Sequence, residues 1–249
     1  QNDIVKTDIA LEKQDSKTAV PVGNARFGFY SKDNIYDKNG NVIVAAGEKI
    51  ATVTTDKEGK AKIPFDVPVM DEGYGKMEGN LNSGDYYFFE ESVSDSYYTN
   101  REKHQVHLEY KDQETAVVSA KAVVKEDQTE TVISKKMIAS SVEIKECHLK
   151  ISDENGNEIV SWITGEISSV KLNEKIDEMG YDNVRVENGD GYAVKIYGLL
   201  HDREYTLTET KPADGFATAN DITFKLVESD DENAKTRVLI KNGDSFTVN

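Results

Sequence analysis

Short runs in which apolar and polar residues alternate recur along the whole chain, separated by turn signals. Residues 25–31 (ARFGFYS), 85–91 (DYYFFEE) and 204–210 (EYTLTET) are three of these runs. Alternation with a period of two is typical of a strand with one buried face. Between the runs, the motifs YDKNGN, TDKEGK and SDENGN each place glycine three residues after aspartate, as turns with a left-handed position require. The pattern predicts an all-β protein built from β-sandwiches.

Sustained helical periodicity is nearly absent from the chain. The best candidate is residues 168–180 (SSVKLNEKIDEMG), where Gly180 is a suitable C-terminal stop. We therefore predict one short helix in this stretch of an otherwise all-β protein.

The two halves of the chain share a plan. Each half has an early strand with a lysine on its inward face, a strand that leads into a D-x-NGN turn, and a strand with the pattern Y-x-x-x-E. The charged stretch 124–131 (VKEDQTET) separates the halves. We predict two tandem β-sandwich domains, residues 1–127 and residues 128–249.

Composition narrows the function classes. Hydrophobic residues make up 37% of the 249 residues, which is enough for packed cores, and 46 acidic against 30 basic residues give a formal charge of −16. Such a surface repels phosphate backbones and anionic membranes, so we expect no nucleic-acid partner. No apolar run is long enough for a membrane span, and we expect no membrane insertion of this segment. Cys147 is the only cysteine, so no intrachain disulfide can form.

Charged residues fall on the inward faces of the first half. Ile9, Leu11 and Lys13 share one face of a predicted strand, and Phe88 and Glu90 share one face of another. Burial of either charge alone costs several kcal/mol, so each group needs a partner or must lose its charge.

The second half repeats this arrangement. Lys135 shares a face with Ile133 and Met137, and Glu209 shares a face with Leu207. Each predicted domain therefore offers one lysine and one glutamate to its core.

These motifs together resemble the collagen-adhesin B-type domain, the SpaA-type module of Gram-positive pilins and surface-protein stalks. The resemblance is closer in the second half, through ISKK, SDENGNEIVSWITG, EYTLTETKPADGFATANDITF and FTVN. The first half resembles the family more loosely, through LEKQDSKTAVPVGNARFGFY, GEKIATVTTDKEGKAKI and GDYYFFEES. The family has an immunoglobulin-like or prealbumin-like β-sandwich fold. Relative to it, the second half carries an insertion near residues 165–190, which is either decoration or a binding surface.

The resemblance implies an autocatalytic isopeptide bond in the second half. Carried over by position, Lys135 would be the nucleophile, Asn249 the acceptor and Glu209 the catalyst. Burial lowers the pKa of a lysine and raises that of a glutamate, so both groups can be neutral at pH 7. A neutral amine can attack the acceptor carbonyl, which a protonated carboxyl polarises. By strand parity Asn249 aligns with Thr247, so its inward orientation rests on the resemblance.

The first half departs from the family at the acceptor. Lys13 and Glu90 fit the nucleophile and the catalyst, but the last strand places Glu126 where the family has asparagine or aspartate. Glu126 has the inward parity and one methylene too many, whereas Asp127 has the family chemistry and the opposite parity. Either residue is a candidate acceptor, and a buried ionic cluster without a covalent bond is the alternative.

The resemblance implies a structural stalk or shaft module of a pilin or adhesin, exposed on the Gram-positive cell wall. Its partners would be other domains or subunits of the same surface structure. The alternative is an adhesin domain that binds a host protein or glycan, which a large exposed aromatic patch on the insertion would support.

Other chemistry finds no support in the sequence. The four histidines lack metal-ligand spacing, and the DKNGN and DENGN motifs lack the glutamate that a calcium loop requires. No nucleophile elbow or phosphate loop occurs. We therefore expect no cofactor, no metal and no enzyme activity on an external substrate. Cys147 is expected to be a small buried residue of the core.

Overall fold

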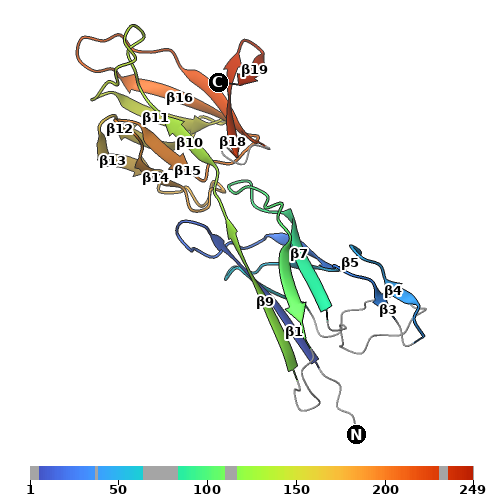
Figure 1. Ribbon diagram of the computed structural model, residues 1–249. Coiled ribbons are helices and arrows are strands. Elements are labelled where there is room, and N and C mark those ends of the chain that lie inside the picture. Colours follow the sequence, from blue (N-terminus) through green and yellow to red (C-terminus); the bar gives the residue numbers. More distant parts are fainter. Residues whose placement is uncertain (1–5, 37–38, 64–83, 110–116, 230–234, 249) are drawn as a thin grey trace. The chain divides into compact units, whose positions relative to one another are not determined.

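The computed structural model describes residues 6–36, 39–63, 84–109, 117–229 and 235–248, and its regular elements are all strands (Figure 1). Contacts within the chain define two compact units. Unit 1 comprises residues 1–94 and 99–127, and unit 2 comprises residues 95–98 and 128–249. The segment 95–98 therefore lies with unit 2, although it falls within the range predicted for the first domain. Within the described ranges, no helix is long and apolar enough to cross a membrane.

Unit 1 is built from two facing sheets and a small hairpin. One sheet has the strand order β6-β1-β9, the other has the order β5-β2-β7-β8, and β3 pairs with β4. The strands of unit 1 are β1 (Lys6–Asp15), β2 (Arg26–Ser31), β3 (Ile35–Tyr36), β4 (Val42–Val44), β5 (Lys49–Thr54), β6 (Lys60–Ile63), β7 (Gly84–Ser92), β8 (His104–Leu108) and β9 (Val117–Glu126).

The first and last strands of unit 1 lie side by side and run parallel (Figure 1). Their register extends from Lys6 opposite Val117 to Asp15 opposite Glu126. The alternation expected from the sequence is confirmed on both strands, because Ile9 and Leu11 of β1 and Ala122 and Val124 of β9 are buried and the residues between them are not. This pairing brings residues that are far apart in sequence to the same end of the sandwich.

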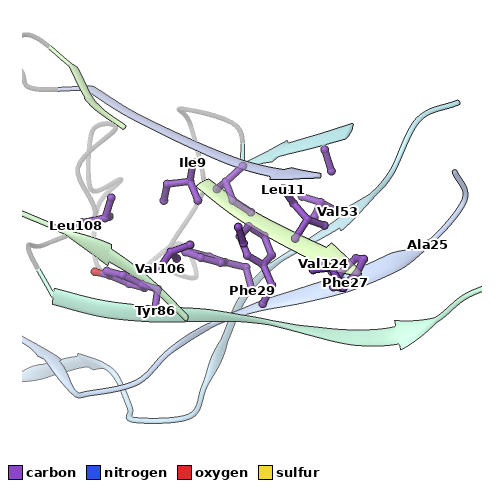
Figure 2. Packing of buried hydrophobic residues seen from close by; sticks show 14 of the residues in the cluster. Ile9, Leu11, Ala25, Phe27, Phe29, Val53, Tyr86, Val106, Leu108 and Val124 are labelled. Atoms are coloured by element: carbon purple, nitrogen blue, oxygen red, sulfur yellow. The ribbon is translucent and has the colours of Figure 1, made fainter. Parts of the chain in front are cut away.

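The core of unit 1 lies between its two sheets. Figure 2 shows side chains of β1 and β9 on one side of this core and side chains of β2, β7 and β8 on the other. Aromatic rings fill the centre: Phe29 stacks on Tyr86 with ring centroids 5.4 Å apart and meets Phe88 at 4.9 Å. Burial of such rings supplies most of the driving force for a sandwich of this size.

Unit 2 has a three-stranded sheet of order β10-β15-β14 and a seven-stranded sheet of order β13-β12-β11-β16-β17-β18-β19. Its core holds a second cluster of buried apolar side chains, with Trp162, Tyr181 and Tyr205 as the largest. The strands of unit 2 are β10 (Glu130–Ile133), β11 (His148–Asp153), β12 (Glu158–Ile163), β13 (Glu166–Leu172), β14 (Arg185–Asn188), β15 (Val194–Tyr197), β16 (Glu204–Lys211), β17 (Ile222–Glu228), β18 (Thr236–Asn242) and β19 (Ser245–Val248).

The predicted helix at residues 168–180 is wrong. The first part of this stretch belongs to β13, which pairs with β12 through Leu172 opposite Val160. The rest is a series of turns, in which the Asn173 side chain accepts a hydrogen bond from the backbone N–H of Lys175. Sheet pairing leaves too few residues for a stable helix, and asparagine favours such local bonds over helical ones. Gly180 closes the turns with a φ of 84°.

The Asp-x-x-Gly turns are confirmed where the structure describes them. The N–H of Gly59 donates to the carbonyl of Asp56, and that of Gly156 donates to Asp153, each at 3.0 Å. Both glycines have positive φ, as predicted. Gly59 has a second role, because a Cβ there would lie 2.3 Å from the backbone oxygen of Lys13. Only glycine allows this close approach.

Candidate functional site

Two backbone hydrogen bonds hold Lys13 in the core of unit 1. Its N–H donates to the carbonyl of Gly59 at 2.7 Å, and its carbonyl accepts from the N–H of Val22 at 3.0 Å. The residue is only 1% exposed, and its Nζ lies 5.2 Å from the centre of the Phe27 ring. A lysine in such a place needs compensating charge.

Two glutamates supply that charge. The Nζ of Lys13 donates a short hydrogen bond to Oε1 of Glu90 and a second bond, 2.7 Å long, to Oε2 of Glu126. The three side chains come from β1, β7 and β9, and each residue is 1% exposed. The parallel register of β1 and β9 places Glu126 here, because Asp15 lies opposite Glu126 and Lys13 lies two residues earlier. The sequence prediction that these inward charges meet in the core is thus matched in unit 1.

The outer carboxylate oxygens are also satisfied. Oε2 of Glu90 accepts the backbone N–H of Asn100 at 2.5 Å, and Oε1 of Glu126 accepts that of Asp127 at 3.3 Å. A buried cluster that is fully hydrogen-bonded is rigid, and it fixes the positions of its members. Glu126 Oε2 is therefore held at the lysine nitrogen.

The cluster contains one cationic group and two carboxyl groups. The pKa of Glu126 is raised to about 8, because burial, helped by the Glu90 charge, outweighs the lowering effect of the Lys13 charge. At neutral pH Glu126 is therefore mostly a neutral carboxylic acid.

Of the two candidate acceptors, Glu126 touches the lysine. Asp127 points elsewhere and accepts a short hydrogen bond from the hydroxyl of Ser16. Strand parity turns Glu126 inward, so of the two carboxyl groups it is that of Glu126 that lies at the lysine. The extra methylene of glutamate does not keep its carboxyl away from Nζ.

Unit 2 has a looser version of this site. The Nζ of Lys135 lies 3.1 Å from Oε1 of Glu209, and the two side chains are 20% and 2% exposed. Lys135 lies beyond the end of β10, which stops at Ile133, and so it is not enclosed by sheet on both sides. Oε2 of Glu209 accepts the backbone N–H of Ala219 at 2.5 Å.

The prediction that burial leaves Glu209 neutral is wrong. Burial by itself would raise the pKa of Glu209, but the Ala219 N–H, Lys135 and Cys147 together lower it below its ordinary value. Glu209 is therefore a carboxylate at neutral pH. Its electrostatic surroundings differ from those of Glu126, although both side chains are buried.

Asn249, the predicted acceptor in unit 2, lies outside the described residues. The sheet register places its neighbour Val248 opposite Leu239, which is opposite Lys225, which in turn is opposite Glu204. Val248 is therefore level with Glu204, about 17 Å along the strand direction from Glu209 at the usual rise per residue. The Lys135–Asn249 bond stays a prediction.

The two lysines nevertheless occupy the same local backbone plan. The carbonyl of Lys13 accepts from the N–H of Val22, and that of Lys135 accepts from the N–H of Ile144 at 2.8 Å. In both units the residue that donates this N–H lies the same number of positions after the lysine. This is direct structural support for the repeat that the sequence indicated.

Cys147 takes the place that Ala25 has in unit 1. The N–H of Ala25 donates to Oγ1 of Thr55, and the N–H of Cys147 donates to Oγ1 of Thr164, both at 3.0 Å. Cys147 is fully buried, as predicted, and burial raises the pKa of its thiol. The thiol is therefore protonated at neutral pH.

Sequence reasoning missed the backbone donors to the glutamates. Asn100 and Ala219 each follow their glutamate, Glu90 or Glu209, by ten residues. The shared spacing between the Y-x-x-x-E strands and the connections after them could have indicated this anchor. No group of three or more potential metal ligands occurs among the residues that the structure describes.

Residues 7–123 match the family model of the SpaA prealbumin-like fold domain. Unit 1 is thus the part that matches, although the sequence motifs had made the second half the closer resemblance. The search of curated proteins gave no match.

Several solved structures resemble the chain at low identity. The Bacillus anthracis TIE protein is 18% identical with a TM-score of 0.46, over 89% of this chain and 32% of that one. The shaft pilin SpaA from Lactobacillus rhamnosus GG is 16% identical with a TM-score of 0.33, over 89% and 93%. A streptococcal ancillary pilin is 15% identical with a TM-score of 0.34, over 92% and 61%. The chain therefore spans about a third of the length of the TIE protein.

Proposed function

Because residues 7–123 form a SpaA-type, pilin-like domain, we propose that the chain is a structural shaft or stalk module of a Gram-positive cell-surface fibre. We propose further that unit 1 closes on itself by an amide between Lys13 and Glu126. The observation that carries this proposal is the 2.7 Å contact between Nζ of Lys13 and Oε2 of Glu126, next to Glu90 in a sealed core.

The bond-forming step balances within the site. Lys13 gives one proton to Glu90, and the neutral amine attacks the carboxyl carbon of the protonated Glu126. The new C–N bond replaces the C–O bond of the departing hydroxyl, which leaves as water with the second proton from nitrogen. Glu90 ends protonated, so the step conserves charge. Fixed proximity of this kind lowers a barrier by about 7–11 kcal/mol.

The mechanical consequence follows from topology. The amide would join the first and last strands of unit 1, which are 113 residues apart at the bonded positions. Closure of a loop of this length removes unfolded-state entropy equivalent to about 4–5 kcal/mol. A pulling force would also pass from β1 to β9 through covalent bonds. The tie would provide the reinforcement that disulfides cannot, since Cys147 is the only cysteine.

The adhesin alternative finds less support. The insertion exposes Ile167 and Leu172, but its Tyr181 is 1% exposed and packs in the core of unit 2. The aromatic patch that a binding surface would show is therefore not formed by this tyrosine. The stalk reading stands as the proposed function.

The test is the intact mass of the denatured, reduced protein. We expect a deficit of one water, with a branched peptide joining Lys13 and Glu126 after proteolysis. Glu90→Gln should abolish this deficit, whereas the matched change Glu209→Gln in unit 2 should leave it unchanged. A deficit of one ammonia would instead report the predicted Lys135–Asn249 bond. Full sequence mass would overturn the covalent proposal and leave a buried ionic cluster.

A further inference from the structure

The outer face of the seven-stranded sheet of unit 2 carries a hollow of about 390 Å³, a volume within the range of small-molecule sites. Polar side chains line it: Lys150 and Ser152 come from β11, Thr206 and Thr208 from β16, and Thr223 from β17. In the sheet register Lys150 lies opposite Thr208. In another row, Thr206 lies between Ser152 and Thr223. The hollow is on the face of the sheet away from the core and is separate from both lysine sites.

A β-bulge accompanies the hollow. Ile151 lies opposite Val160 on β12, whereas Ser152 lies opposite Glu158, so β12 carries one extra residue at this point. Bulges bend a strand and increase its twist, and they are frequent next to functional sites. Ser152 is only 7% exposed, yet it lines the hollow, while Ile151 packs in the core.

The hydroxyl groups in the hollow have unused hydrogen-bonding capacity. Within the part of the chain that the structure describes, no side-chain hydrogen bond is made by four of the lining residues: Ser152, Thr206, Thr208 and Thr223. Each hydroxyl can donate one hydrogen bond and accept others. Several such groups on neighbouring strands match a ligand whose own hydroxyl groups also donate and accept, which is the chemistry of a sugar.

Charged groups flank these hydroxyls. Lys150 has no carboxylate partner among the described residues, so its ammonium is available to an anion. On β18, Nζ of Lys241 lies 3.2 Å from Oε2 of Glu204, and both side chains stay partly exposed. The Glu204 carboxylate can accept hydroxyl groups of a ligand. Together with Asp153 and Glu154, which also line the hollow, it disfavours a doubly charged anion such as phosphate.

We propose that this hollow is a binding site for a short acidic saccharide, with the sugar carboxylate at Lys150 and the sugar hydroxyls along Thr206, Thr223 and Glu204. A hydrogen bond between an ammonium and a carboxylate is charge-assisted and orients the ligand. No aromatic ring is among the described residues that line the hollow, so we expect weak binding, with a dissociation constant of about 1 mM. The site adds ligand binding to the proposed shaft function and does not depend on the amide of unit 1.

The experiment is a titration of the full, isotope-labelled chain, followed by the NMR shifts of its backbone amides. The probes are glucuronate, its neutral counterpart glucose and inorganic phosphate, at constant ionic strength. We expect glucuronate to shift the amides of β11 and β16 around Lys150 and Thr206, with half-saturation at about 1 mM. Glucose should bind about fivefold more weakly, because it lacks the carboxylate that pairs with the lysine. Phosphate should give no saturable shifts in the hollow.

Two variants and a matched control separate the contacts. Lys150→Gln keeps a polar side chain without the charge and should remove the preference for glucuronate over glucose. Thr206→Val keeps the branched shape without the hydroxyl and should weaken the binding of both sugars by about fivefold. Lys171→Gln changes an exposed lysine of β13 that does not line the hollow, and it should alter neither affinity. The spectrum of each variant shows whether it is folded, and Thr223→Val replaces Thr206→Val if that variant does not fold.

The proposal is overturned by any of four results: no saturable shifts with glucuronate, shifts that map away from β11 and β16, equal binding of glucuronate and either other probe, or a glucuronate preference that survives Lys150→Gln. Equal binding of phosphate would mean a simple anion site. The water deficit is measured on the same samples, so that failure of the saccharide site and failure of the amide are told apart.

Discussion

The two lysine sites share one backbone plan and differ in what covers them. Lys13 is enclosed between β6 and β9 and touches two glutamates, whereas Lys135 follows the end of a four-residue strand and touches one. The side chain of Lys13 is inaccessible, while that of Lys135 is 20% exposed. The comparison shows that a lysine and a glutamate in the family positions do not by themselves make a sealed site. The parallel last strand does so, by excluding water and bringing the third group.

The largest expected difference concerns the lysines themselves. Lys13→Met prevents the proposed amide, and we expect unit 1 to lose at least the roughly 4–5 kcal/mol of unfolding free energy that closure of this loop contributes. Lys135→Met leaves the buried Glu209 with the Ala219 N–H as a donor and should cost unit 2 less, about 1–3 kcal/mol. Denaturant titration followed by hydrogen exchange assigns each loss to its unit. Equal losses in the two units would show that the two lysine sites do not differ in this way.

The rate of amide formation in unit 1 should depend on pH through the carboxylic acid of Glu126. The pKa of Glu126 is raised to about 8, so the reactive carboxylic acid is present below that pH and is lost as the pH rises above it. For freshly refolded protein we expect the rate of water loss to fall about tenfold per pH unit above 8. Mass spectra taken over time from pH 6 to 10 measure this rate. Asp127→Asn should leave the profile unchanged, and a rate that keeps rising above pH 8 would contradict the assignment of Glu126.

If Glu90→Gln blocks the amide, the raised pKa of Glu126 makes the stability of unit 1 depend on pH. Burial, the largest cause of the shift, persists in that variant, so folded Glu126 keeps a pKa above its unfolded value. Its stabilising contribution is then complete below the ordinary glutamate pKa and is lost as the pH rises toward 8. Unfolding free energies measured at pH 4.5 and pH 8.5 should therefore differ, with unit 1 more stable at the lower pH.

Substitution of the turn glycines Gly59 and Gly156 should also destabilise the two units to different extents, by smaller amounts. Gly59→Ala puts a Cβ against the carbonyl of Lys13 at a positive φ, and we expect it to cost about 1–3 kcal/mol and to slow water loss. Gly156→Ala meets no atom within 4 Å and should cost about 1 kcal/mol from its backbone conformation alone. Thermal unfolding of the two variants tests this. Identical costs would mean that the turn does not position the lysine.

The smallest effect is expected at the pair of equivalent small residues. Cys147→Ala gives unit 2 the side chain that unit 1 has at Ala25, and we expect a change of about 1 kcal/mol or less. Because the thiol is buried and its pKa is raised, native protein should also resist alkylation. Rapid modification of the folded protein would show that this part of unit 2 opens readily.

Much of this molecule was determined by the sequence alone. Period-two alternation assigned the strands and turned Lys13, Glu90 and Glu126 inward, because side chains on a strand can point to only two faces. The Asp-x-x-Gly spacing assigned the turns, since only glycine adopts their left-handed position easily. The repeat was visible because both halves place a lysine and a glutamate at matching points of the same pattern.

The tertiary structure decided the remainder, for reasons of register and enclosure that no local pattern contains. Residues 168–172 became strand because β12 offered hydrogen bonds that outweighed helical preference. Pairing of β1 with β9 brought Glu126, rather than Asp127, to Lys13, and burial then raised the pKa of Glu126. In unit 2, hydrogen bonds to Glu209 lowered its pKa despite burial. A carboxyl group's charge state depends on which donors the fold brings to it, and that is settled only when distant strands meet.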